Sequence, residues 1–182
     1  MKNLFIVLVS LFVSFDILAQ VARQKDSHEH GAAKLMMVME GEKLQIEFEV
    51  PSESLIGFEH FPKSQSNRKN FNEAIKILSV PSKLFSIPIK AECLLVGMNV
   101  SQSLFSNEEE HGHDESEKSE IHSEFESNYY WNCQHLDEID SIGTQLMSFF
   151  FGIEEIRVNW ISNNGQGSLE LESKDDRIKG WE

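Results

Sequence analysis

The stretch 121–133 reads IHSEFESNYYWNC and carries the clearest secondary-structure signal in the chain. Its odd positions are apolar or aromatic except for two serines, and its even positions are polar except for Tyr130. This two-residue period is typical of a strand that buries one face and exposes the other. We therefore predict a strand over 121–133 in which His122 and Glu124 lie side by side on the exposed face.

Neighbouring signals extend this pattern toward the N-terminus. The segment LQIEFEV at 44–50 alternates in the same way and predicts a second half-buried strand. An apolar run at 35–39 precedes it, and the turn Glu40–Glu42 between them predicts a hairpin. Over 67–78, apolar residues instead fall at i, i+3, i+4 and i+7, so we predict an amphipathic helix there.

The rest of the chain supplies the remaining elements of an α+β domain. We expect strands at 93–100, 156–160 and 169–171, and an irregular piece between Pro81 and Pro88. A second helix is expected from the apolar stripe Leu136, Ile139, Ile142, Leu146, Phe149 and Phe150. The predicted order is therefore ββαβ, a loop and βαββ, which makes a mostly antiparallel sheet with two packed helices.

Charge narrows the classes of partner. The chain has 182 residues and a net charge of −14, from 16 basic and 30 acidic side chains. No basic stripe is visible, so we expect neither nucleic acid nor an anionic membrane surface as a partner. The segment 107–126 alone carries nine acidic residues, one lysine and three of the seven histidines. We predict an acidic, His-containing loop over 101–120 that is disordered without metal, and a small cation is its natural partner.

The first residues are typical of an export signal. Lys2 precedes a short apolar run at 4–15, which is too short to span a bilayer, and Ala19 offers a small residue for cleavage. We predict a signal peptide over 1–19 and one mature domain over 20–182, with an uncleaved anchor as the alternative. No direct membrane insertion is expected after cleavage.

Export also bears on the two cysteines, Cys93 and Cys133, because a cysteine pair in an exported domain usually forms a disulfide. The alternatives are two buried thiols or a cysteine-containing metal site. If the strands at 93–100 and 121–133 pair as a hairpin with the cysteines opposite each other, residue numbers across the hairpin add up to 226. The acidic loop then forms its tip.

Two short motifs before residue 61 are candidates for metal binding. His28 and His30 would point to the same side of an extended segment and suit Zn²⁺, Cu²⁺ or Ni²⁺. The alternative is a loose N-terminus without a role. Glu59 and His60 follow Gly57, and in a turn both could reach one ion. The alternative there is a histidine that caps the loop before Pro62.

Two further motifs lie in the second half of the chain. His122 and Glu124, at i and i+2 on one strand face, make half of a tetrahedral site, or else an ordinary solvated polar face. His111 and His113 lie among carboxylates, where ordering the loop costs entropy and weakens binding. That segment is otherwise a solubilising linker.

Three of these motifs together carry a family resemblance. HEHGAAKL at 28–35, PSESLIGFEHFP at 51–62 and IHSEF at 121–125, followed by an aromatic strand and Cys133, resemble the ZrgA-like periplasmic zinc-binding proteins of Gram-negative bacteria. The resemblance covers about residues 28–172. It implies a periplasmic location and zinc uptake through an ABC-type inner-membrane transporter. The implied ligands are His28, His30, Glu59, His60, His122 and Glu124, with His111 and His113 in a variable His-rich loop.

The favoured interpretation is a periplasmic protein that captures Zn(II) and delivers it to the components of an ABC transporter. An enzyme such as a zinc hydrolase is disfavoured, because no HExxH, nucleophile-elbow or CxxC motif is present. Two alternatives stay open: a non-catalytic adaptor that docks through the acidic loop, and a site for another transition metal, copper or nickel.

Overall fold

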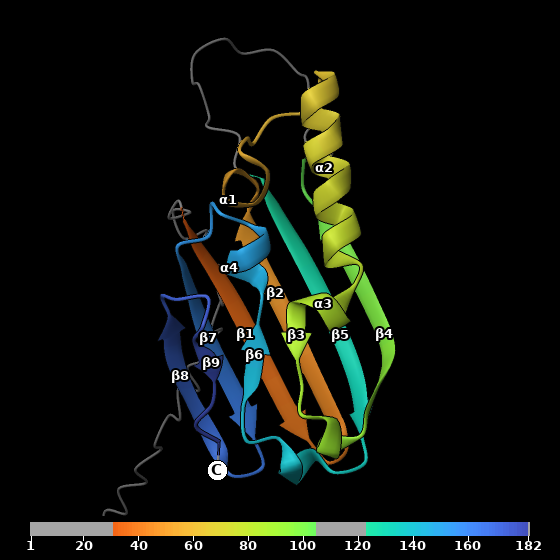
Figure 1. Ribbon diagram of the computed structural model, residues 1–182, viewed down its shortest axis with the longest axis vertical. Helices are drawn as coiled ribbons and strands as arrows, with labels where there is room; N and C mark the ends of the chain where they lie inside the picture. Colours follow the sequence, from red (N-terminus) through yellow and green to blue (C-terminus); the bar gives the residue numbers. More distant parts are fainter. Residues whose placement is uncertain (1–30, 105–122, 182) are drawn as a thin grey trace, which may run out of the picture.

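The computed structural model describes residues 31–104 and 123–181, which form two packed layers (Figure 1). One layer is a six-stranded sheet with the strand order β4-β5-β2-β1-β7-β8. The pairing of β1 with β7 is parallel, and the other pairings in this sheet are antiparallel. Its strands are β1 (Ala32–Glu40), β2 (Lys43–Pro51), β4 (Cys93–Gln102), β5 (Glu124–Cys133), β7 (Glu155–Ser162) and β8 (Gly165–Leu171).

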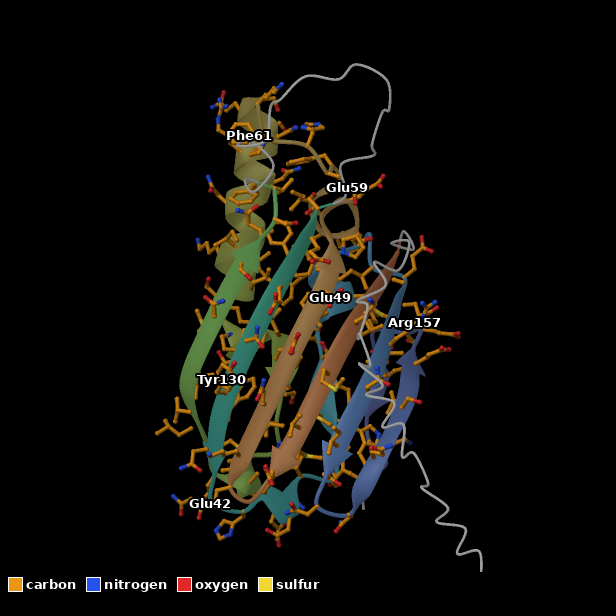
Figure 2. The ribbon with its side chains drawn as sticks, turned by 180° about the vertical axis from the view of Figure 1, so that it is seen from behind. Glu42, Glu49, Glu59, Phe61, Tyr130 and Arg157 are labelled. Carbon is orange, nitrogen blue, oxygen red and sulfur yellow. A yellow bond between two sulfur atoms is a disulfide. The ribbon has the colours of Figure 1, made fainter. Side chains whose placement is uncertain are left out.

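The second layer covers only one face of that sheet. It combines helices with a small three-stranded sheet of order β3-β6-β9. Figure 2 shows the opposite face, which carries no described helix or strand and exposes side chains such as Glu49 and Tyr130. The covering elements are α2 (Gln65–Leu78), α3 (Pro81–Leu84), α4 (Leu146–Phe149), β3 (Phe85–Ser86), β6 (Ile142–Thr144) and β9 (Arg177–Ile178).

Alternation explains why the sheet is half buried. The predicted strand at 121–133 is confirmed as β5 from Glu124 onward, and the inward-facing side chains from Ser123 to Cys133 are all buried. Tyr129 lies at the centre of the core, where its hydroxyl donates to the Leu78 carbonyl of α2 at 2.9 Å. Burial raises the pKa of Tyr129 to about 12, because the phenolate would lose its hydration.

The hairpin of β4 and β5 confirms the cysteine prediction. Cys93 and Cys133 lie opposite each other and form a disulfide. The predicted sum of 226 holds as far as Leu95, opposite Trp131, and then shifts by one so that Gly97 lies opposite Tyr130. A β-bulge at this point absorbs the extra residue.

The predicted second helix is wrong. The interval that follows β5 forms a 3₁₀ turn (Leu136–Glu138), the short strand β6 and the single turn α4. The apolar stripe still marks buried positions, since Ile139, Ile142 and Leu146 have at most 2% of their surface exposed. Gly143 disfavours a helix and the β-branched Thr144 favours a strand at this place, where β6 pairs with β9.

The other predicted elements keep their type. The helix predicted at 67–78 is α2, which begins after Ser64 because that hydroxyl accepts a bond from the Asn67 amide. The strands predicted near 156–160 and 169–171 belong to β7 and β8. The piece between Pro81 and Pro88 is more regular than predicted, since it contains α3 and β3.

Two predicted segments fall mostly outside the described residues. The signal peptide at 1–19 lies there entirely. The acidic loop at 101–120 does so from 105 onward, while Ser101 and Gln102 belong to β4. Within the described ranges, no helix is both long and apolar enough to cross a membrane.

Candidate metal centre

The HxHG motif leads directly into the first strand. His28 and His30 lie outside the described residues, but Gly31, which follows them, is fixed on both sides. Its amide donates to the Ser54 hydroxyl at 3.0 Å, and its carbonyl accepts from the amides of Glu154 and Glu155. Gly31 has a φ of 85°, which favours glycine over any residue with a side chain. Gly31, the residue that follows the histidine pair in the sequence, therefore lies between Ser54 and the start of β7.

The GFEH motif follows the short helix α1 (Ser52–Ile56), which continues from the end of β2. Gly57 ends this helix in the left-handed conformation, with a φ of 83°, and its amide donates to the Glu53 carbonyl. The chain then turns so that Glu59 is half buried and His60 is exposed. One carboxylate oxygen of Glu59, Oε1, is shielded from solvent.

The HSE motif is tied to the same place through Ser123. The hydroxyl of this buried residue donates to the Glu59 carbonyl at 3.1 Å, and its own carbonyl accepts from the Ser52 amide at 2.8 Å. Glu124 follows as the first residue of β5, half buried and opposite Pro51. His122 precedes Ser123 and lies outside the described residues.

These bonds gather three motifs at one end of the large sheet, which we call the motif end: Gly31, α1 with the turn to His60, and Ser123 with Glu124. In Figure 2, Glu59 lies at this end, above the strands. Antiparallel pairing explains the convergence, because β2 ends where β5 begins, and β1 starts beside the end of β2. Three segments far apart in the sequence are therefore joined by hydrogen bonds of three serines. Ser54 and Ser123 contribute their hydroxyls, and Ser52 contributes its backbone amide.

His60 is held in an orientation suited to a ligand. Its ring stacks on Phe58 with the centroids 5.0 Å apart, and Nδ1 lies 2.9 Å from the Phe61 carbonyl oxygen. A carbonyl only accepts, so Nδ1 is the donor in this bond, and in the neutral ring Nε2 is the nitrogen with the free lone pair. Metal-binding histidines use the same arrangement, in which one ring nitrogen is bonded to a carbonyl and the other faces the ion.

The described residues supply only part of a coordination sphere. Of the eight predicted ligands, Glu59, His60 and Glu124 are described, whereas His28, His30, His111, His113 and His122 lie outside. Within residues 31–104 and 123–181, no three histidine, cysteine or acidic side chains are placed to hold one ion. A site at the motif end therefore needs side chains from the segments that continue from Gly31 or Ser123.

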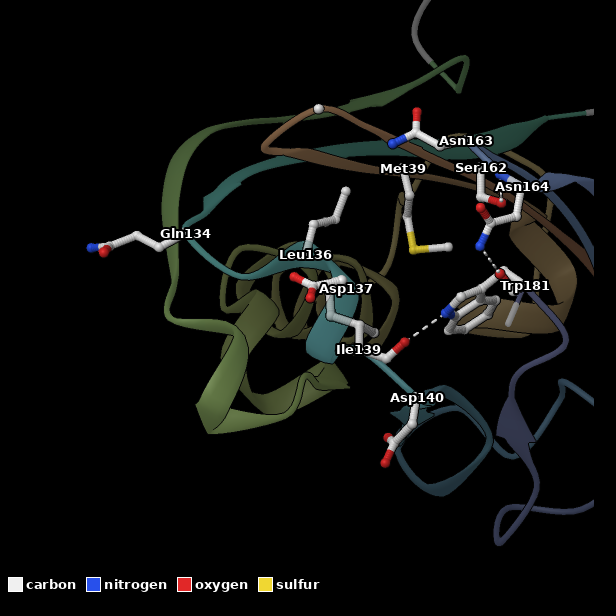
Figure 3. Close-up of a pocket in the computed structure, with 11 residues that line it drawn as sticks. Met39, Gln134, Leu136, Asp137, Ile139, Asp140, Ser162, Asn163, Asn164 and Trp181 are labelled. Atoms are coloured by element: carbon white, nitrogen blue, oxygen red, sulfur yellow. Dashed lines mark hydrogen bonds between the residues drawn. The ribbon is translucent and has the colours of Figure 1, made fainter.

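The opposite end of the sheet, which we call the disulfide end, has a pocket of a different character. Its volume is about 450 Å³, and none of its lining residues is a predicted ligand. Figure 3 shows the Trp181 indole donating to the Ile139 carbonyl at 2.6 Å and the Asn164 amide donating to the Trp181 carbonyl. His135, the other described histidine, also lies at this end, where its amide donates to Ala91.

Sequence reasoning missed the residues that position the motifs. Ser52, Ser54 and Ser123 are buried and connect the three segments by the bonds described above. One signal was available, because Ser123 lies on the otherwise apolar face of the predicted strand. A small hydroxyl at such a position indicates a local hydrogen bond more often than packing.

The sequence also matches a known protein family. Residues 27–180 match the model of the ZrgA family zinc uptake protein. The chain belongs to the ZrgA family. No individually curated protein matches it. The matched range includes all three motifs of the motif end. The family match associates the chain with zinc and with zinc uptake.

Proposed function

We propose that the chain captures Zn²⁺ in the periplasm at the motif end and delivers it to an ABC-type uptake system. The ligands in this proposal are His28, His30, Glu59, His60, His122 and Glu124, and His111 with His113 in the acidic loop supply a weaker, faster-exchanging site. The reaction is coordination and release, without catalysis. Export by a signal peptide over 1–19 brings the chain to the periplasm.

The observation that supports this proposal most is the Ser123 junction. One residue bonds the Glu59 carbonyl through its hydroxyl and the Ser52 amide through its carbonyl, while His122 and Glu124 flank it in the sequence. Zinc needs about four nitrogen, sulfur or oxygen ligands. The proposed histidine and carboxylate ligands of the three segments are enough to supply four such atoms. A cysteine ligand is not needed, and Cys93 and Cys133 are already bound to each other.

The test compares the mature chain, from Gln20, with a variant that lacks residues 107–118. Each protein is stripped with chelator, reloaded with Zn²⁺ and analysed by native mass spectrometry. We expect at least one tightly bound zinc ion in both proteins, because the main ligands lie outside the deletion. Loss of all zinc with the deletion would assign binding to the acidic loop. Zinc in neither protein would favour the adaptor function.

A matched pair of histidine variants locates the site. His60→Ala removes a proposed ligand at the motif end, whereas His135→Ala removes an exposed histidine at the disulfide end. We expect only the first to lower zinc affinity in a competition assay with a chromophoric chelator. Equal losses would contradict a site at the motif end. The same assay with Cu²⁺ and Ni²⁺ measures how strongly the site prefers zinc to these two ions.

A further inference from the structure

Gly152 brings the turn after α4 into direct backbone contact with the short helix α1 at the motif end. A Cβ atom at position 152 would overlap the carbonyl oxygen of Ser54 and lie 3.0 Å from its carbonyl carbon. Nonbonded carbon atoms stay about 3.5–4.0 Å apart, so only glycine fits here. The φ of Gly152 is not in the left-handed region. Space, and not backbone conformation, therefore requires glycine at this position.

Both segments in this contact are also bonded to Gly31. The Ser54 hydroxyl accepts from the Gly31 amide at 3.0 Å, and the Gly31 carbonyl accepts from the Glu154 amide at 2.8 Å. Gly31, Ser54, Gly152 and Glu154 thus form a closed ring of contacts, which we call the glycine joint. Figure 1 shows α1 and α4 next to each other at this end of the sheet.

Each of the two segments is anchored to the rest of the fold. Phe150 and Ile153, on either side of Gly152, are buried with 4% of their surface exposed. In α1, Ile56 is buried and the Ser52 amide donates to the carbonyl at the Ser123 junction. Close-packed interiors transmit strain, so a shift of either segment disturbs the contacts of its neighbours.

A larger residue at position 152 would reach the proposed site by either of two routes. If α1 gives way, the bond between Ser54 and Gly31 weakens, and the turn that carries the GFEH motif shifts with the helix. If the turn after α4 gives way, the bond from the Glu154 amide to the Gly31 carbonyl weakens instead. Both routes end at Gly31, which follows His30 in the sequence.

We propose that Gly152, through the glycine joint, is a positioning residue of the zinc site. It lets α1 pack against the turn after α4, and so fixes α1 and Gly31 relative to each other. Two of the three segments that carry proposed ligands are held in this way. This role rests on the proposed zinc function, because it is read through zinc affinity.

The test compares the zinc affinities of the mature chain and of Gly152→Ala, by competition with a chromophoric chelator. We expect the variant to bind zinc about 10-fold more weakly, as is typical when a group that orients metal ligands is disturbed. Gly97→Ala is the matched control, because a Cβ there would lie 3.6 Å from the Tyr130 ring, an ordinary contact distance. This control should bind zinc like the unmodified chain, and an equal loss in both variants would overturn the proposal.

A double-variant cycle separates positioning from a purely structural role. Ser54→Ala removes the hydroxyl that bonds Gly31, and it should also weaken zinc binding by about 10-fold. Because both substitutions act through the glycine joint, the double variant should lose much less than the roughly 100-fold expected of independent effects. A full 100-fold loss would overturn the proposal. A lower urea midpoint of Gly152→Ala with unchanged zinc affinity would overturn it too.

Circular dichroism shows whether each variant is folded. If Gly152→Ala does not fold, Ser54→Ala decides: weaker zinc binding supports positioning through the glycine joint, and unchanged binding overturns it. Tight zinc binding by the unmodified chain and by every folded variant would overturn this role and leave the zinc function standing. No zinc binding by the unmodified chain would overturn both.

Discussion

The two ends of the large sheet are held together by different means. At the disulfide end, the Cys93–Cys133 bond joins β4 to β5, and Lys90 forms an ion pair with Glu138 at 2.9 Å. The Trp181 indole closes this end from the C-terminal side through its bond to Ile139. At the motif end, by contrast, serine hydroxyls and backbone amides join three segments, and the proposed metal ligands are close neighbours of these serines in the sequence.

We therefore expect the disulfide end to contribute mainly to the stability of the fold and the motif end mainly to metal binding. The contacts described at the disulfide end are a covalent bond, an ion pair and a hydrogen bond within the chain itself. The motif end instead holds Glu59, His60 and Glu124, which are proposed ligands, and it adjoins in the sequence the segments that carry the proposed histidine ligands. Strand length puts the two ends about 30 Å apart, so a substitution at one end should leave the properties of the other almost unchanged.

The largest expected effect comes from removing the disulfide. The double variant Cys93→Ala with Cys133→Ala should lose about 4 kcal/mol of unfolding free energy, because a closed loop of about 40 residues restricts the unfolded chain. Urea denaturation measures this loss. Zinc affinity of the folded fraction should stay unchanged, and a parallel loss of zinc affinity would show that the two ends are coupled.

The next largest effect is on binding. We expect His60→Ala to weaken zinc affinity by about 100-fold or more, since it removes a proposed ligand whose ring is already oriented by the Phe61 carbonyl. The midpoint of urea denaturation without zinc should not change, because His60 is exposed. A large change in this midpoint would mean that His60 supports the fold as well as the site.

Between the two ends, Tyr129 reports on the shared core. Its pKa is raised to about 12 in the folded protein, so unfolded chains release the phenol proton more easily, at their ordinary pKa of about 10. This stability is fully present below pH 10 and is lost as the pH rises toward 12, by on the order of 2 kcal/mol. Urea denaturation between pH 9 and pH 12 measures it.

Tyr129→Phe is the control for that titration. It removes the bond to the Leu78 carbonyl and lowers stability at neutral pH. It should also flatten the decrease between pH 10 and pH 12, because the group that titrates is gone. An equally steep decrease in this variant would assign the pH dependence to another tyrosine or to lysines.

The smallest expected effect concerns a positioning residue. Ser123→Ala removes the hydroxyl that holds the Glu59 carbonyl, so we expect a loss of about 10-fold in zinc affinity. Ser127→Ala is the matched control. Ser127 lies on the same buried face of the sheet as Ser123 but further along β5, away from the motif end. If Ser123→Ala bound zinc as tightly as Ser127→Ala, Ser123 would have no specific role in positioning the ligands.

Sequence patterns predicted the parts of this fold that have a long, regular period. The alternation in β5 and β2, the helical spacing in α2 and the cysteine register were all sufficient. The interval after β5 misled the prediction, because Ile139, Ile142 and Leu146 are buried in strand, turn and helix alike, so burial alone does not identify the element. Strands of two or three residues, such as β3 and β6, are too short to show a period.

The sequence predicted the motifs of the candidate site, but it did not predict that they lie together at one end of the sheet. Glu59, His60 and Glu124 were predicted as ligands from their residue types and spacing, and this stays a prediction. The convergence of their segments depends on strand order, and β1 pairs with β7 across more than a hundred residues. The bonds of Ser54 and Ser123 depend on that order too. A local sequence pattern cannot contain such information, because both partners of each bond come from distant segments.

A crystal structure of the mature, zinc-loaded chain, with anomalous scattering measured at the zinc edge, tests the central claim most directly. We predict an anomalous peak at the motif end, at about 2.0–2.1 Å from Nε2 of His60, with further ligands from the segments that precede Gly31 and Ser123. A strong peak only within residues 105–120, or in the pocket at the disulfide end, would contradict it.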